Sequence, residues 1–259
     1  MDNRSSSPPW APRNEFGITP RPGQYLVALA GNPNVGKSTV FNALTGMRQH
    51  TGNWPGKTVN NAQGSFTHCG RSFLLVDLPG TYSLLASSPE EEIARDFICF
   101  GRPDVTVVVA AAACLERNLN LALQVMEITP RVVVCVNLLD EAKKKSIQVD
   151  TGALSRRLGV PAVGTVARTG RGLKELRDAI CQVAVSSGVP DPRPVEYHRE
   201  VEKVVQEILP RITPLTGNAV NPRWVALRML DGDRTLIEKI DAYLDNCPPL
   251  TGHPEGEAV

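Results

Sequence analysis

One segment of the sequence has the residue types and spacing of a phosphate-binding loop. It reads Gly31-Asn32-Pro33-Asn34-Val35-Gly36-Lys37-Ser38, a match to G-x-x-x-x-G-K-S, and Thr39 continues it into a helical stretch. Glycines let the backbone close around phosphates, and successive N–H groups at a helix N-terminus stabilise their charge. We expect Lys37 to reach the β and γ phosphates of a nucleotide, and the Ser38 hydroxyl to bind Mg²⁺.

A second candidate lies where another apolar stretch ends, at Asp77-Leu78-Pro79-Gly80. The Asp77 carboxylate is expected beside the Mg²⁺ site, acting through a coordinated water, and the Gly80 N–H is expected to meet the γ phosphate. Taken alone, D-x-x-G is a turn in most proteins. Downstream of a phosphate loop it predicts a nucleotide-sensing switch.

Two further segments have the features of a base-recognition site. Asn137-Leu138-Leu139-Asp140 follows an apolar run and has the form N-x-x-D, in which the aspartate accepts hydrogen bonds from guanine and the asparagine bridges loops. Leu138 stands where many GTPases have lysine, and it retains only the aliphatic packing on the base. Thr165-Val166-Ala167 is the expected last base-contacting loop, with the Ala167 N–H offered to the guanine oxygen. The alternative for 137–140 is an ordinary turn at a strand end.

The motifs can form one site only if strands position them, and the apolar pattern predicts such strands. Runs of β type at 25–30, 72–76, 105–110, 131–136 and 162–166 alternate with helical stretches, as in a mostly parallel sheet covered by helices. Ser88 and Pro89, Asp150 and Thr151, and Gly172 mark three helix starts.

After a change of composition at 186–194 only helical spacing remains, at 195–209, 223–230 and 234–244. We therefore expect an α/β domain at 23–188 and a small all-α domain at 189–248. Flexible tails are expected at 1–22 and 249–259, with order beginning near Gln24.

Composition excludes several classes of protein. Lys and Arg number 28 against 27 Asp and Glu, and the resulting net charge of +1 argues against nucleic-acid binding. The longest nearly apolar run, 105–115, is shorter than the roughly 20 residues of a membrane-spanning helix, so this chain is expected to be soluble. The six cysteines form no C-x-x-C pair and the four histidines have no metal-ligand spacing, which favours reduced thiols.

Several longer segments resemble the cytosolic N-terminal region of the bacterial ferrous iron transport protein B family, FeoB. They are GNPNVGKSTVFNALTG at 31–46, GNWPGKTV at 52–59, DLPGTYSL at 77–84, SPEEEIARDF at 88–97 and LERNLNLALQ at 115–124. The resemblance is close over 25–186 and weaker through the helical region, where PRWVALRML at 222–230 is the most recognisable part. GNWPG and LERNL are more specific than the phosphate loop.

The resemblance implies a Ras-like P-loop GTPase domain that binds GTP and GDP and hydrolyses GTP slowly. Residues 49–60 resemble switch I, in which Gly56 and Lys57 precede Thr58, the threonine that senses the γ phosphate and Mg²⁺. Asn34 corresponds to the asparagine associated with K⁺-stimulated hydrolysis. No glutamine follows Gly80, so a water-positioning side chain of the Ras type is absent and slow turnover is expected.

The resemblance also implies a place in the cell. The helical domain of the family joins the GTPase domain to transmembrane helices that control Fe²⁺ uptake, at the cytoplasmic face of the bacterial inner membrane. This chain lacks those helices and therefore reads as a piece of a longer protein. The transmembrane region and small Feo accessory proteins are the implied partners. The oligomeric state is not indicated.

Some residues depart from the family pattern, and two other functions stay open. Val109-Ala110-Ala111-Ala112-Ala113-Cys114 replaces polar family positions, which is expected to loosen that loop, and Lys57 and Asn60 change the neighbours of Thr58. Trp54, in a Gly-rich loop, is expected over the nucleotide or at an effector surface as readily as in a core. The alternatives are a soluble Era-like assembly GTPase and a nucleotide-binding module with impaired hydrolysis.

Overall fold

A computed structural model describes residues 16–46, 49–85, 88–186, 191–217 and 219–246 of the chain. Its contacts divide the chain into two compact units, with the division between Pro194 and Val195. The expected tails at 1–22 and 249–259 lie outside the described residues, except for 16–22. Each unit is described by itself.

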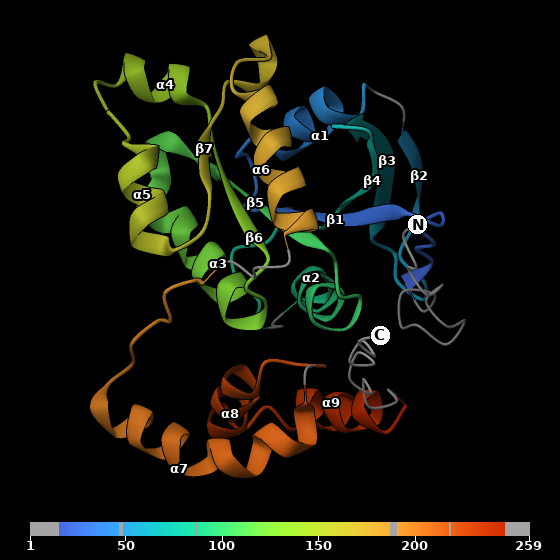
Figure 1. The fold of residues 1–259 in the computed structure, drawn as a ribbon, viewed down its shortest axis with the longest axis vertical. Helices are drawn as coiled ribbons and strands as arrows, with labels where there is room; N and C mark the ends of the chain where they lie inside the picture. Colours follow the sequence, from blue (N-terminus) through green and yellow to red (C-terminus); the bar gives the residue numbers. More distant parts are fainter. Residues whose placement is uncertain (1–15, 47–48, 86–87, 187–190, 218, 247–259) are drawn as a thin grey trace, which may run out of the picture. The chain divides into compact units, whose positions relative to one another are not determined.

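The first unit is built on a seven-stranded sheet of order β2-β3-β4-β1-β5-β6-β7 (Figure 1). The strands are β1 (Gln24–Gly31), β2 (Gln49–Asn53), β3 (Asn60–His68), β4 (Arg71–Asp77), β5 (Val105–Ala111), β6 (Val132–Asn137) and β7 (Ala162–Gly164). Neighbours from β4 to β7 pair in parallel, whereas β2 with β3 and β3 with β4 pair antiparallel. The prediction of a mostly parallel sheet is confirmed, and its five apolar runs are the five parallel strands.

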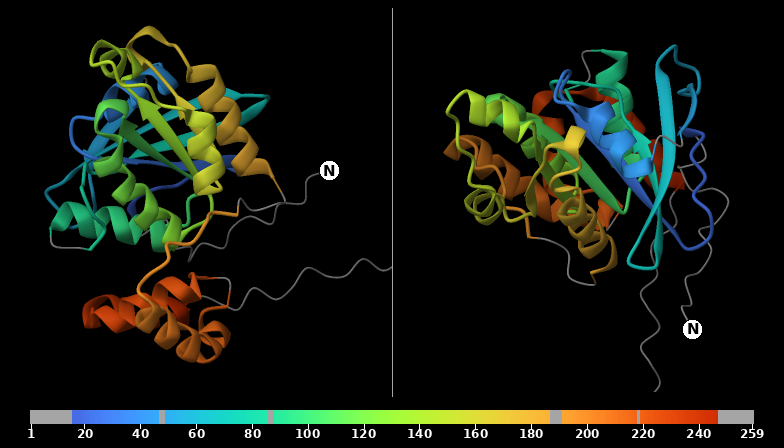
Figure 2. Two further views of the ribbon diagram at one scale, coloured as in Figure 1. Left: turned by 90° about the vertical axis from the view of Figure 1, so that its left-hand side faces the viewer. Right: turned by 90° about the horizontal axis from the view of Figure 1, so that it is seen from above.

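Helices lie on both faces of this sheet (Figures 1 and 2). They are α1 (Lys37–Thr45), α2 (Pro89–Phe100), α3 (Leu115–Ile128), α4 (Leu139–Lys144), α5 (Thr151–Leu158) and α6 (Leu173–Val185), with short 3₁₀ turns η2 (Ala112–Cys114) and η3 (Ala167–Thr169). α1 and α6 pack on one face and on each other, while α3 packs on β5 and β6 and contacts α2. Because parallel strands are buried on both faces, β1, β5 and β6 are apolar along nearly their whole length.

The three predicted helix starts are found, and two of them have side-chain caps; Gly172, the N-cap of α6, has none. The Ser88 hydroxyl accepts a hydrogen bond from the Glu91 N–H at the start of α2, where Pro89 occupies the first turn. Asp150 accepts from the Ala153 N–H at the start of α5. Such caps satisfy N–H groups that the first helical turn leaves unpaired.

The antiparallel hairpin β2–β3 was not predicted. Its sequences, QHTGN and NNAQGSFTH, are mostly polar and carry no apolar run. β2 lies at the edge of the sheet and β3 alternates buried and exposed residues, so only one side of it contributes to the core. Half-buried strands of this kind give a much weaker sequence signal than the central parallel ones.

The N-terminal segment is ordered earlier than expected. Ile18 is fully buried, and the ring of Phe16 packs edge-on against Trp54 and Phe97 at centroid distances of 6.2 and 5.3 Å. Trp54 is only 2% exposed, so of the two places expected for it the core is found, and the nucleotide or effector surface is not. Three aromatic residues from the N-terminus, the β2–β3 loop and α2 form one cluster, and this burial outweighs the flexibility of the Gly-rich loop.

The second unit contains the helices α7 (Arg199–Thr216), α8 (Pro222–Asp231) and α9 (Arg234–Asn246). α8 contacts both α7 and α9, and the buried residues include Val205, Ile212, Trp224 and Leu236. The expected first helix, 195–209, is displaced: it begins at Arg199 and continues through Pro210 and Pro214. Both prolines are exposed, so the carbonyl groups they leave unpaired can bind water. Among the described helices, none has the length and apolar character to span a bilayer.

Candidate nucleotide site

The phosphate loop connects the end of β1 to the start of α1, as predicted. Gly36 has a φ of +80°, and a Cβ there would lie 2.5 Å from the Asn137 side-chain nitrogen. Only glycine therefore fits this position without displacing a neighbouring loop. Asn34 also has a positive φ, +66°, which asparagine tolerates better than most residues, and its side chain is exposed.

Asn137 joins three loops, as expected for the asparagine of N-x-x-D. Its amide nitrogen donates to the Val35 carbonyl oxygen at 3.1 Å, inside the phosphate loop. Its Oδ1 accepts from the Thr165 hydroxyl at 3.0 Å and from the Ala167 N–H at 3.1 Å. The structure therefore brings 31–38, 137–140 and 165–167 together at the carboxyl end of the parallel strands, where ligands bind in such sheets.

The hydrogen bonds of Asn137 alter the expected role of Ala167 in binding guanine. The Ala167 N–H, predicted to be offered to a guanine oxygen, is donated to Asn137 instead. A contact with a base would have to share or replace this bond. Leu138 has a φ of +62° and is the N-cap of α4. Asp140 lies in the first turn of this helix.

Lys37 is paired within the protein. Its ammonium group contacts the Asp77 carboxylate and donates to the Leu78 carbonyl oxygen at 2.6 Å. Burial raises the pKa of Asp77 above its usual range, and Lys37 opposes that rise by its charge and its hydrogen bond. The loop lysine and the switch carboxylate thus neutralise each other, so a phosphate that recruits Lys37 would release Asp77.

Two buried polar groups at this edge have no hydrogen-bond partner among the described residues. They are both atoms of the Asn32 amide, in the phosphate loop, and the Oδ1 atom of Asp140. The other Asp140 oxygen has only a 3.4 Å contact from Arg168, whose side chain is 77% exposed. Because an unsatisfied buried carboxylate oxygen is costly, its presence indicates a missing donor.

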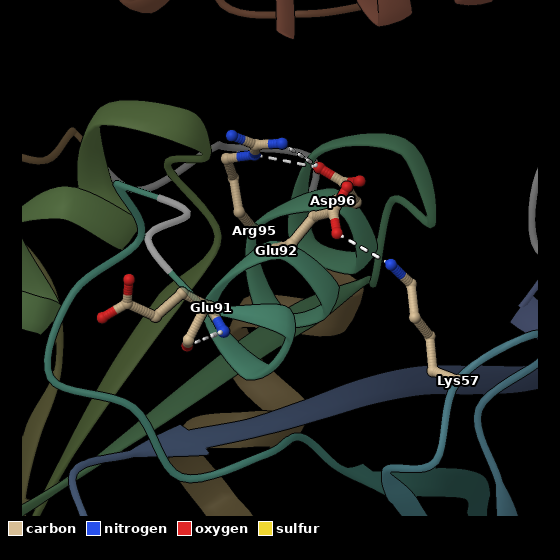
Figure 3. Close-up of polar contacts among 6 residues, drawn as sticks. Lys57, Glu91, Glu92, Arg95 and Asp96 are labelled. Atoms are coloured by element: carbon tan, nitrogen blue, oxygen red, sulfur yellow. Dashed lines mark hydrogen bonds and ion pairs between the residues drawn. The ribbon is translucent and has the colours of Figure 1, made fainter. Parts of the chain in front are cut away.

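Of the expected switch I segment, 49–60, residues 49–53 form β2, residue 60 begins β3, and the rest is the loop between them. Gly56, Lys57 and Thr58 are all exposed, and the backbone closes on itself through Lys57 N–H to the Trp54 carbonyl at 3.0 Å. The Lys57 ammonium reaches Glu92 of α2 at 2.9 Å, next to the Arg95–Asp96 pair (Figure 3). This ion pair ties the loop to α2, and no local sequence signal indicated it.

The segment that was expected to be loose is held in place. β5 continues to Ala111, whose N–H donates to the Asn118 side-chain oxygen at 2.7 Å, and Asn118 is buried. Asn118 belongs to the LERNL segment of α3, so this helix anchors the end of β5.

Taken together, the sheet order and the three convergent loops define a P-loop nucleotide-binding domain of the Ras-like class, followed by a small helical domain. Comparisons with known proteins agree. The family described as "Ferrous iron transport protein B" matches residues 25–180, and the family "FeoB cytosolic helical domain" matches residues 197–251. The chain belongs to the FeoB family.

Individual relatives support this membership. The Fe(2+) transporter FeoB of Escherichia coli K12 is 39% identical over 214 residues, which cover 81% of this chain. The apo-form cytosolic domain of T. maritima FeoB is 38% identical, with a TM-score of 0.77 and 88% of each chain covered. The cytosolic domain of L. pneumophila FeoB is 31% identical, with a TM-score of 0.76, and covers 85% of this chain and 87% of its own. The chain spans about a quarter of the length of its curated relatives, 27% for the E. coli protein.

Proposed function

We propose that this chain binds GTP and GDP at the site described above and hydrolyses GTP slowly as the regulatory part of a ferrous iron transporter. The observation that carries the proposal is the buried, unpaired Oδ1 of Asp140. Guanine offers two adjacent donors, its ring N1–H and its exocyclic amino group, whereas adenine has an acceptor at N1. T. maritima FeoB has been solved in GDP and GMPPNP forms, which supports the same choice of base.

The phosphates would be held by the N–H groups of residues 34–39, which follow Pro33, and by Lys37. Lys37 would then leave Asp77, whose carboxylate becomes available near the Ser38 hydroxyl at the start of α1. Ser38, Thr58 and Asp77 supply hydroxyl and carboxylate oxygens, which is the donor chemistry that Mg²⁺ prefers, so these residues fit that ion. Mg²⁺ would neutralise phosphate charge there.

Hydrolysis would follow in line. A water oxygen bonds to the γ phosphorus while the bond from that phosphorus to the β–γ bridging oxygen breaks, giving GDP and inorganic phosphate. The Gly80 N–H and Thr58 would contact the γ phosphate before cleavage and lose that contact afterwards. Since Lys57 is adjacent to Thr58 and paired with Glu92, α2 is the element through which the change in switch I would spread.

K⁺ is the proposed stimulating ion. The exposed side-chain amide of Asn34 offers a carbonyl oxygen, a suitable ligand for a monovalent cation beside the phosphates. The positive charge would be the contribution that an arginine finger makes in other GTPases. The positive φ of Asn34 gives a second reason for asparagine here, so the two roles have to be separated by experiment.

The cellular role follows from family membership. We propose that the nucleotide state of this domain regulates Fe²⁺ uptake through the transmembrane region of the same protein, at the cytoplasmic face of the bacterial inner membrane. A relative from Porphyromonas gingivalis is a fusion of Fe(2+) transport protein A with FeoB, which supports small accessory proteins as partners. An RNA-directed assembly role is not favoured by a net charge of +1.

The test is phosphate release from GTP in K⁺ and in Na⁺. We expect faster release in K⁺, and the Asn34→Ala variant should lose this difference while still binding GDP. If the wild-type protein binds GDP but releases no phosphate in either salt, the chain is instead a binding module with impaired hydrolysis. Equal release in both salts would remove the potassium role alone.

A further inference from the structure

Three side chains capable of binding a metal meet at the hairpin turn between β3 and β4. His68 ends β3, Cys69 follows it, and Asp178 reaches them from α6. One ligand atom from each of the three lies within 4.8 Å of the others, and His68 Nε2 is 2.6 Å from Asp178 Oδ1. Asp178 is far from His68 and Cys69 in the sequence and is brought to them by the packing of α6 against β3.

The turn places a cysteine at a backbone position that usually holds other residues. Cys69 and Gly70 both have positive φ, +48° and +70°, as in a two-residue type I′ hairpin loop. The first position of such a turn favours asparagine, aspartate or glycine, and a cysteine there is strained. A costly backbone conformation that holds a reactive side chain in one place points to a function for that side chain.

A second thiol lies close to the group without belonging to it. Cys181 is three residues after Asp178 on α6, hence on the same face of the helix. The three side chains whose ligand atoms do meet offer one imidazole, one carboxylate and one sulfur atom.

We propose that His68, Cys69 and Asp178 bind one divalent transition-metal ion, Zn²⁺ in preference to Fe²⁺. Nitrogen, thiolate and carboxylate donors are typical zinc ligands, and three of them leave a fourth tetrahedral position for water. Bonds of about 2.0–2.3 Å put the donor atoms of such a site roughly 3.3–3.8 Å apart. Binding would require the 2.6 Å contact between His68 Nε2 and Asp178 Oδ1 to widen to that spacing.

The proposed site is distinct from the nucleotide site and does not depend on the proposed function. Its donors include sulfur and nitrogen, whereas Ser38, Thr58 and Asp77 offer oxygen alone. Cys69 and Asp178 are exposed, so an ion can enter from solvent. A bound ion would fasten the β3–β4 hairpin to α6 and so stabilise the folded state against unfolding.

The experiment is a titration of the untagged, nucleotide-free 259-residue chain with Co²⁺, in a non-thiol reductant and excess Mg²⁺. We expect one Co²⁺ per chain, with a thiolate-to-cobalt charge-transfer band and the intense visible absorption of tetrahedral cobalt. Zn²⁺ should displace the Co²⁺ at a lower concentration than anaerobic Fe²⁺. The reverse order would overturn the assignment to zinc, and no charge-transfer band would overturn the site.

Two variants distinguish a lost metal ligand from a damaged fold. Cys69→Gly removes a ligand but places glycine at a positive φ, so it is not expected to lower the Tm of the metal-free protein. It should weaken Co²⁺ binding at least about tenfold and abolish the rise in Tm caused by Zn²⁺. The matched control is Cys114→Ser, which removes another exposed cysteine and should leave both readouts unchanged. Unchanged binding in Cys69→Gly would contradict the proposal.

Discussion

Two carboxylates, one in each unit of the chain, have opposite surroundings. Glu202 of the helical unit accepts hydrogen bonds from Arg223 through both oxygens, at 2.6 and 2.8 Å, and from the Tyr197 N–H at 2.9 Å. Asp140 of the sheet unit has one buried oxygen with no partner among the described residues and one weak contact from an exposed arginine.

The difference separates a carboxylate with a structural role from one that we propose has a binding role. Glu202 is satisfied by its own fold, and its pKa is lowered to about 2, first by the Arg223 hydrogen bonds and then by the Tyr197 N–H. Asp140 retains acceptor capacity that the protein does not use. A partner from outside the chain is the simplest account of that unused capacity, and guanine supplies the required donors.

The largest effect is expected from Gly36→Ala. The added Cβ would meet the Asn137 amide at 2.5 Å in a backbone conformation that alanine rarely adopts, so the loop and its bridge would move apart. We expect GDP affinity to fall roughly 100-fold, which corresponds to about 2.7 kcal/mol. A fluorescent GDP titration measures it, and Gly46→Ala is the control, because it also has positive φ but open space around it. Equal affinities for the two variants would show that the Asn137 contact is unimportant.

Glu202→Gln should lower the stability of the protein without changing its affinity for GDP, unlike a substitution at the nucleotide site. It weakens charge-assisted hydrogen bonds that are partly exposed to solvent, so the free energy of unfolding should fall by about 1 kcal/mol. GDP affinity should be unchanged. Urea unfolding and the same GDP titration provide the two readouts, and a loss of GDP affinity would break the distinction between the carboxylates.

Acid should remove the contribution of Glu202 in a defined range. Because its pKa is lower in the folded state than its usual value of 4.5, the stabilisation is complete above about pH 4.5 and is lost as the pH falls towards 2. The difference in urea midpoint between wild type and Glu202→Gln should therefore shrink between pH 6 and pH 3. A difference that grows on acidification would contradict the sign of this pKa shift.

The smallest effect on stability is expected at the Lys57–Glu92 pair. Its side chains are 41% and 29% exposed, and ion pairs of this kind contribute about 0.2–1 kcal/mol. Lys57→Ala should lower the free energy of unfolding within that range, similar to the exposed pair removed by Lys203→Ala. A loss above about 2 kcal/mol would mean that the loop is anchored mainly through this pair.

Sequence patterns predicted the parts of this fold that are governed by local chemistry. Apolar runs located the five parallel strands because both faces of those strands are buried, and caps located the helix starts. The hairpin β2–β3 was missed because it is polar. The place of Trp54 was left open because its partners, Phe16 and Phe97, come from elements distant in the sequence.

The candidate site, like the fold, was predicted in part. Its loops follow short motifs and were placed correctly at one edge of the sheet. Their pairings were not predicted, because Lys37 with Asp77, Arg168 with Asp140 and Lys57 with Glu92 each join two separate elements. The His68–Asp178 contact has the same character, and no residue spacing could have indicated it.

The most direct test of the account is the base preference of Asp140→Asn. We expect the variant to bind GDP about 1.5–3 kcal/mol more weakly than the wild type, because a charge-assisted acceptor is lost. It should gain affinity for xanthosine diphosphate, whose carbonyl oxygen at C2 can accept from the new amide. Competition of both nucleotides against fluorescent GDP measures this in one experiment. If the variant keeps wild-type affinity for GDP and does not bind xanthosine diphosphate, Asp140 does not read the base and the central claim is wrong.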